Sequence, residues 1–239
     1  MLKINALNID FEKLNDKVRS ANDDVEISNC LGQRFIGAGL SNKNLIIKGT
    51  PGNALGAYLN GSSINVFGNA QDAVGDTMND GKIIIHGNIG DCAGYAMRGG
   101  KIFVKGNAGY RAGIHMKAYE EKIPALVIGG TAGSFLGEYQ AGGIIIVLGT
   151  NADKNIIGNF PCTGMHGGKM LLRSNCKNIA FPENVHVKTA EENDIAEFYP
   201  YIKEFCSCFG YDEKEMLNAD FTLVFPDNNN PYKQMYVQN

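Results

Sequence analysis

Four histidines give this sequence side chains that could act as acids, bases or metal ligands near neutral pH. His86 ends a short apolar run, and His115 occupies a different position of the repeat described below, so the two do not form a metal-binding face. His186 is isolated. His166 lies in the run Gly-Met-His-Gly-Gly, where glycines leave backbone amides open. It is the one candidate site residue, although a turn residue is the simpler interpretation.

Six cysteines are the second set of side chains with chemical potential. Cys206 and Cys208 form Cys-Ser-Cys on a predicted helix, where residues two apart face different directions and are poor joint metal ligands. The other four, Cys30, Cys92, Cys162 and Cys176, have no base at a useful spacing. The glycine spacing is GxxGxxxG, which is neither a dinucleotide-binding nor a P-loop motif. We therefore predict no catalytic, cofactor-binding or metal-binding residue in this chain.

Composition excludes several classes of protein. The formal net charge is −3, whereas a nucleic-acid-binding surface requires clustered basic residues. No apolar run approaches the roughly 18 residues of a membrane span. The first residues lack the apolar stretch of a signal peptide, and the cysteines include no CxxC pair. We expect a cytoplasmic protein that binds neither nucleic acid nor membrane.

Glycine reveals how the chain is organised. It accounts for 30 of 239 residues, above the usual share of about 7%. All glycines except Gly210 fall between Gly32 and Gly168. Aligned on the glycine that follows each short apolar run, the segments recur at spacings of 19, 19, 19, 24 and 19 residues, and Ser174 continues the phase. A period of about 20 residues predicts a solenoid.

Two apolar positions, two residues apart, define a short strand in every repeat. The first column is Leu45, Ile64, Ile83, Ile102, Leu126, Ile145 and Met170, and the second is Ile47, Val66, Ile85, Val104, Ile128, Val147 and Leu172. This alternation is the strand period, and helical repeats would not tolerate so much glycine. We therefore predict an all-β core: a parallel β-helix of about seven coils, stacked at about 4.8 Å, with α-helical segments on either side.

The recurring glycines are predicted to be structural, at corners and at close approaches between coils. They are Gly49, Gly52, Gly56, Gly68, Gly75, Gly87, Gly90, Gly94, Gly106, Gly109, Gly113, Gly130, Gly133, Gly137 and Gly149. Leu59, Met78, Met97 and Met116 share a further column, which we interpret as core filling rather than a ligand stripe.

The column between the two apolar ones should point out of the helix. It reads Ile46, Asn65, Ile84, Phe103, Val127, Ile146 and Leu171, and all but Asn65 are apolar. A solvated stripe of this kind would be unusual, so we expect something to cover it. Either the head or tail of the chain itself or a partner subunit would do so.

Basic residues form a shorter column beside these strands. Lys82 and Lys101 occupy the same position in adjacent coils, and Lys169 is in phase further along the chain. Together with Arg98 and Arg111 they would contact an acidic partner, or they form a solvated face, which is the simpler interpretation.

The two ends of the chain have the pattern of caps. Asp10 is predicted to begin a helix that carries Phe11, Leu14 and Val18 on one face. In the tail, Thr189 and Glu192 match a capping box, Pro200 should kink or split the helix that follows, and Gly210 should end it. Residues 226–239 are expected to be extended. This divides the chain into an N-terminal helical cap (1–40), the β-helix (41–175) and a C-terminal helical segment with a tail (176–239).

Three phrases of the repeat carry a family resemblance. They are GTPGNALGAY (residues 49–58), GNAQDAVG (68–75) and GEYQAGGIIIVLG (137–149). They closely resemble the GXGXG domain, which is the C-terminal β-helix domain (domain 3) of the glutamate synthase large subunit. A related β-helix domain of formylmethanofuran dehydrogenase has the same style of repeat. The match covers about residues 32–174, and the head, the helical tail and the ending Asn-Pro-Tyr-Lys (230–233) look like the stand-alone version of the domain.

The resemblance implies a right-handed β-helix, in agreement with the usual hand of parallel crossovers. It implies a non-catalytic structural subunit of a split glutamate synthase, placed between glutaminase and FMN-bearing synthase subunits and helping to enclose the ammonia path. FMN and iron–sulfur clusters are then expected in the partner subunits, and no position here matches their ligands. Two alternatives stay open: a β-helix subunit of formylmethanofuran dehydrogenase or another oxidoreductase complex, and an independent ligand-binding or enzymatic β-helix. A homo-oligomer is also compatible with the sequence.

Overall fold

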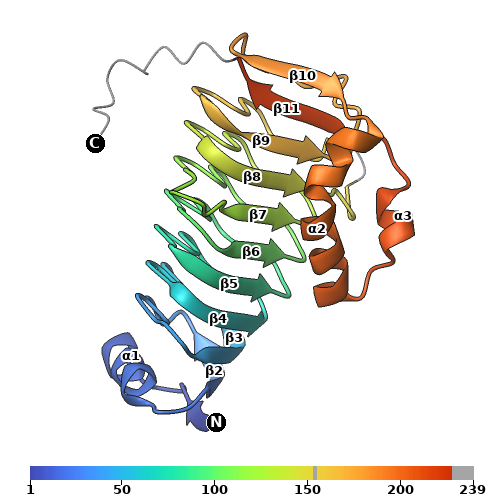
Figure 1. Ribbon diagram of the computed structural model, residues 1–239. Coiled ribbons are helices and arrows are strands. Elements are labelled where there is room, and N and C mark those ends of the chain that lie inside the picture. The colour runs from blue at the N-terminus through green and yellow to red at the C-terminus, as the bar shows by residue number, and fades with distance from the viewer. Residues whose placement is uncertain (153–154, 228–239) are drawn as a thin grey trace, which may run out of the picture.

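Parallel coils stacked along one axis make up most of the computed structural model, which describes residues 1–152 and 155–227. Nine strands lie side by side in chain order, each parallel to its neighbour (Figure 1). These strands are β1 (Leu2–Asn5), β2 (Val25–Leu31), β3 (Asn44–Thr50), β4 (Asn60–Phe67), β5 (Asp80–Ile85), β6 (Lys101–Val104), β7 (Ala125–Ile128), β8 (Ala141–Val147) and β9 (Gly167–Leu172).

The register confirms the predicted parallel β-helix. Strands β3 to β9 are the seven predicted coils, and their columns align residue for residue, as in the pairing of Ile83 with Ile102 and Ile85 with Val104. The stack also extends further toward the N-terminus than the boundary drawn at residue 41, because β1 and β2 belong to the same sheet. Val25 and Ile27 pair with Leu45 and Ile47, so the strand alternation begins before the glycine repeat does.

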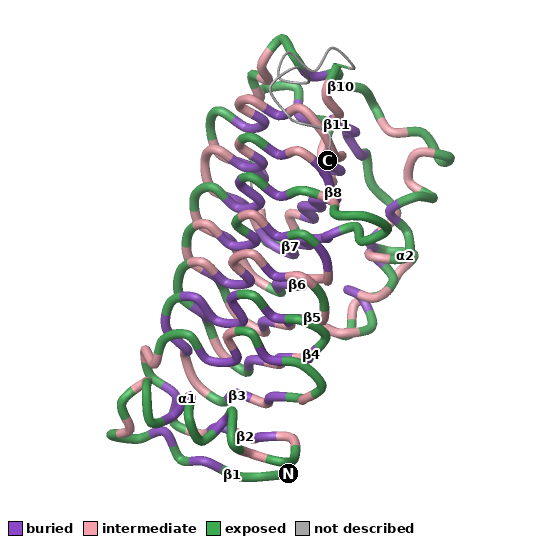
Figure 2. Tube along the Cα trace, turned by 60° about the vertical axis from the view of Figure 1, so that its left-hand side comes forward, coloured by how far each residue is buried: buried purple, intermediate pink, exposed green. Residues whose placement is uncertain are grey.

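Both apolar columns face the interior of the coils and are fully or almost fully buried (Figure 2). Leu59, Met78, Met97 and Met116 are buried in the same core. Close packing between coils explains the glycines. A Cβ atom on Gly133 would lie 2.7 Å from the carbonyl carbon and oxygen of Gly109 in the preceding coil, and Gly113 has φ +71°, where L side chains are strained.

Helix α1 (Phe11–Ser20) closes the N-terminal end of the stack. Asp10 caps it as predicted, since its carboxylate accepts a hydrogen bond of 2.8 Å from the backbone N–H of Lys13. Leu14 and Val18 are buried in the solenoid core. The Asn15 amide also donates to the carbonyl oxygen of Arg34 at 2.9 Å, which fixes the helix against the first turns.

The tail adds strands as well as helices. It contains β10 (Val185–Thr189), α2 (Glu192–Phe209), α3 (Glu213–Leu217) and β11 (Thr222–Pro226). Strand β11 lies antiparallel between β9 and β10, so it covers the last edge of the parallel sheet. Residues 228–239, including the Asn-Pro-Tyr-Lys ending and most of the segment expected to be extended, lie outside the described residues.

Helix α2 differs from its prediction at two points. Thr189 belongs to β10, where it pairs with Thr222, so the predicted capping box of Thr189 and Glu192 is wrong. Asp194 instead accepts a hydrogen bond from the backbone N–H of Glu191 at 2.9 Å. The helix is not split at Pro200, because its apolar face packs on the sheet both before and after that residue. Gly210 ends the helix as predicted, with φ 74°.

Across the described part of the chain, we find no helix with the length and apolar character needed to cross a bilayer.

Candidate functional site

The outward apolar column is covered by the tail of the chain itself along most of its length. Phe103, Val127 and Leu171 are fully buried. They form a second core with α2 and β11, to which the helix contributes Phe198, Ile202 and Phe205. Ile146 belongs to the same core, Ile84 is half-buried at its margin, and Ile46 lies half-buried further toward the N-terminus. Of the two alternatives, the tail therefore covers Phe103 to Leu171.

The lysine column also faces helix α2. The carboxylate of Glu204 pairs with the ammonium groups of both Lys82 and Lys101, the second at 2.6 Å. Lys169 pairs with Glu197 at 2.5 Å. Burial acts to raise the pKa of Glu204, but the hydrogen bonds from Lys101 and Lys82 outweigh it and hold that pKa below its ordinary value. The lysines thus hold the helix, and the structure does not present them as a free anion-binding row.

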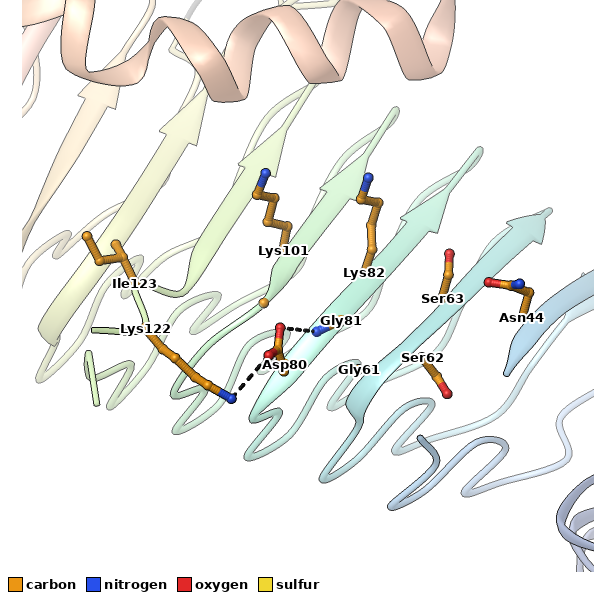
Figure 3. Close-up of a pocket in the computed structure, with 11 residues that line it drawn as sticks. Asn44, Gly61, Ser62, Ser63, Asp80, Gly81, Lys82, Lys101, Lys122 and Ile123 are labelled. Carbon is orange, nitrogen blue, oxygen red and sulfur yellow. Dashed lines mark hydrogen bonds and ion pairs between the residues drawn. The ribbon is translucent and has the colours of Figure 1, made fainter. Parts of the chain in front are cut away.

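An open groove of about 480 Å³ runs beside these lysines (Figure 3). Lys82 and Lys101 line it and point toward the helix in this view. Lys122 pairs with Asp80 at 3.1 Å, and Asp80 also accepts a hydrogen bond from the backbone N–H of Gly81 at 2.7 Å. Every charged side chain of the groove is therefore already matched, and the arrangement resembles a surface network more than a reaction centre.

His86, His115 and His186 each contact aromatic rings at separate places in the fold. His86 contacts Asn65 at 3.0 Å and stacks on Phe67, and burial, with a smaller effect of Lys105, lowers its pKa. His115 stacks on Tyr139, with ring centroids 5.1 Å apart.

His166 is half-buried, and its Nδ1 lies 3.0 Å from the carbonyl oxygen of Gly164. Among residues 1–152 and 155–227, no three His, Cys, Asp or Glu side chains gather closely enough to hold a metal.

The cysteine thiols are poor nucleophiles in this fold. Burial raises the pKa of Cys162 to about 12 and that of Cys30 to about 11, so both stay protonated at neutral pH. Cys206 is buried while Cys208 is half-buried, as expected for residues two apart on a helix. Burial raises the pKa of both.

A ladder of polar side chains was not predicted from the sequence. The Asn69 amide oxygen accepts from the backbone N–H of Asn88 at 2.8 Å, Asn88 repeats this with Asn107, and Asn107 with Thr131. Asp72 and Asp91 form a second, parallel ladder on the same turns. The signal was present, because asparagine directly follows the phase glycine in three consecutive coils. These hydrogen bonds link neighbouring coils.

Aromatic side chains gather on exposed turns of the coils. Tyr95, His115 and Tyr139 follow one another in ring contact, with Tyr95 and Tyr139 each 40% exposed. Phe135 stacks on Phe160, and the Arg111 guanidinium lies 5.2 Å from the Phe135 ring centroid. Arg111 is paired with Glu138 at 2.9 Å. The turns therefore present exposed aromatic rings on the surface of the protein.

These features define a glycine-rich parallel β-solenoid whose helical tail is packed on one side and whose turns are exposed on the other. The chain belongs to the GXGXG motif family, whose profile matches residues 9–227. It is 42% identical over 249 aligned residues to "Uncharacterized protein MJ1350" of Methanocaldococcus jannaschii, covering 98% of this chain and 95% of the relative.

A solved structure shows the same fold. It is a chain of the crystal structure of the formyltransferase/hydrolase complex (FhcABCD) from Methylorubrum extorquens, determined in complex with methylofuran. The similarity covers 92% of this chain and 88% of that chain, with a TM-score of 0.63 and 18% sequence identity. At that identity the similarity concerns the fold.

Proposed function

We propose that this chain is a non-catalytic β-solenoid subunit of a split glutamate synthase. In this role it lies between glutaminase and FMN-bearing synthase subunits in the cytoplasm and helps to enclose the ammonia path between them. The observation that carries the proposal is the GXGXG repeat, which matches residues 9–227 and keeps the phrases quoted from residues 49–58, 68–75 and 137–149. FMN and iron–sulfur clusters would then reside in the partner subunits.

The surface of the chain supports a docking role. Helix α2 already occupies the outward face of β6 to β9, so that face is satisfied within the chain. The exposed turns, by contrast, carry aromatic side chains such as Tyr110, 56% exposed, and Phe160, 63% exposed. Aromatic residues are enriched in protein interfaces, which makes the turn side the one that partner subunits would contact.

A second candidate is a subunit of a formylmethanofuran-related complex. The structural similarity to a chain of FhcABCD favours it, because that chain is itself part of a multi-subunit assembly. The two candidates share the solenoid and the docking role, and they differ in the enzymes that travel with it.

Native co-purification of the tagged full chain from its own cells tests both candidates. A glutaminase subunit and a synthase subunit with flavin absorbance and iron support the split glutamate synthase. Subunits with molybdenum or tungsten, or a formyltransferase, support the second candidate. Recovery of the chain by itself at native expression level would overturn both.

A further inference from the structure

A groove of about 560 Å³ lies between helix α1 and the turns of the first coils. One wall is the exposed side of α1, and the floor comes from the turns that precede β3, β4 and β5. Figure 1 shows α1 beside these turns, at the end of the stack away from α2 and β10. The groove is therefore separate from the lysine network and from the covered apolar column.

The groove offers exposed aromatic rings over a floor of small residues. Phe35 is 43% exposed and Tyr58 is 57% exposed, while Ala54 and Ala57 beneath them are buried. Phe35 and Tyr58 have φ of 60° and 56°, in the left-handed region.

The repeat does not require large side chains at these positions. Phe35 is followed in its column by Ala54, Ala73, Cys92, Arg111 and Phe135, and Tyr58 by Thr77, Ala96, His115 and Tyr139, all with the same positive φ. Small residues occupy the same turns in the next coils, so the turns do not need the rings of Phe35 and Tyr58 to form. The Phe35 ring also contacts Phe11 of α1, with ring centroids 6.1 Å apart.

The rim of the groove is acidic. Glu12, Asp16 and Asp76 line it against a single cation, Arg19. Within the described residues, none of the three carboxylates lies within ion-pair distance of a basic group. Glu12 and Asp16 are also four apart on one helix, where like charges disfavour the helix. Arg34 is near, but it lies over the Phe11 ring and does not line the groove.

We propose that this groove docks a segment of a partner subunit that carries a lysine or arginine beside an apolar side chain. The cation would lie between the carboxylates and the faces of Tyr58 and Phe35, and the apolar side chain would lie on the alanine floor. Phosphate-bearing partners are disfavoured by the local negative charge. The inference rests on the proposed function, because it presupposes that the chain is a subunit.

Binding of defined peptides to the full chain tests the chemistry of the groove. The probe is a fluorescein-labelled, acetylated Gly-Leu-Lys-Leu-Arg-Leu-Gly peptide, measured by fluorescence anisotropy at 50 mM salt. We expect it to bind at least about tenfold more tightly than the same peptide with glutamates in place of Lys and Arg, or with serines in place of Leu. Equal binding of the three peptides would overturn the proposal.

Matched variants locate the binding. Asp16→Asn and Tyr58→Asn should each weaken the basic peptide at least about threefold, and asparagine tolerates the positive φ at Tyr58. Glu121→Gln and Tyr119→Asn remove a carboxylate and a phenol ring from exposed positions elsewhere and should change binding less than about twofold. Equal losses of binding in the control variants would overturn the assignment to the groove. Sedimentation equilibrium supplies a second test: if the chain self-associates and the groove variants abolish this, the occupant is a second copy of the chain and the proposal is wrong.

Co-purification of wild-type and Asp16→Lys chains separates this inference from the proposed function. If the wild type recovers partner subunits and the variant loses most of them, both stand. If both chains recover the subunits equally, the groove inference is wrong while the proposed function stands. If the wild type recovers none, the proposed function is wrong, and with it the inference that a partner subunit occupies the groove.

Discussion

Replacing Phe103 by alanine tests directly what covers the outward column of the solenoid. The Phe103 side chain is fully buried in the core that α2 and β11 share with the sheet. A phenylalanine-to-alanine change in such a core costs about 3–5 kcal/mol. A surface helix can settle partly into the space, so we expect about 3 kcal/mol here. For a chain of this length that corresponds to a decrease in Tm of about 6–12 °C.

The measurement is thermal and urea unfolding of the purified chain without any partner, together with hydrogen exchange in α2. We expect faster exchange of the amide hydrogens along Glu192–Phe209, because the helix loses part of the apolar surface on which it packs. Phe103→Leu keeps most of the volume and should cost less than about 1.5 kcal/mol. Ile46→Ala, at the half-buried end of the column, should cost less than Phe103→Ala. A loss below about 1 kcal/mol for Phe103→Ala in the isolated chain would refute the reasoning, since the tail would then not seal this face.

Four further predictions concern single contacts. The carboxylate of Glu204 has a lowered pKa in the folded chain, so the stability that it contributes is present above the ordinary value of 4.5 and is lost as the pH falls through the folded value. The variant Glu204→Gln should therefore lose less unfolding free energy than the wild type between pH 6 and pH 3. An unchanged dependence on pH would contradict the bridge to the lysines. At neutral pH the same variant should lose no more than about 1 kcal/mol, because the pairs are partly exposed. Gly133→Ala forces a Cβ to 2.7 Å from the backbone of the preceding coil and should cost about 1–3 kcal/mol in urea unfolding; a neutral result would show that the coils can separate. Asn88→Ala removes the oxygen that accepts the 2.8 Å hydrogen bond from the Asn107 N–H and should cost about 1 kcal/mol by the same measurement. No loss of stability would show that the ladder does not stabilise the coils. The thiol of Cys162 has its pKa raised to about 12 by burial, so a disulfide reagent at pH 8 should modify it only after unfolding, and rapid labelling of the native chain would contradict that burial.

Periodic features of the sequence predicted most of the fold. Each apolar pair such as Leu45 and Ile47 recurs in every coil, so a single period defined seven strands and their register. Asp10 and Gly210 were readable because helix caps are local. Strand β2 was missed because Val25 and Ile27 repeat the apolar alternation of the coils, but no glycine of the repeat precedes them. The antiparallel pairing of β11 with β9 and β10 joins segments far apart in sequence, and one sequence contains no record of such pairing.

The site features divide in the same way. The outward column was visible in the sequence, yet the choice between tail and partner depended on where Phe198 and Phe205 come to lie. The lysine column was visible too, but its partner Glu204 is 103 residues from Lys101. The groove beside α1 was not predicted, because Tyr58 and Asp16 come together only when the helix folds back on the first coils.

Helix α2 changes how the stack should come apart. A solenoid coil normally contacts only its neighbours, so coils can unzip one at a time. This helix of 18 residues is about 27 Å long, whereas five strands from β5 to β9 span about 19 Å. Its Glu197 pairs with Lys169 on β9, and its Glu204, seven residues further along, pairs with Lys82 and Lys101 on β5 and β6. We therefore expect the coils from β5 to β9 to unfold together with α2 as one cooperative unit. The coils before β5 should unfold one at a time.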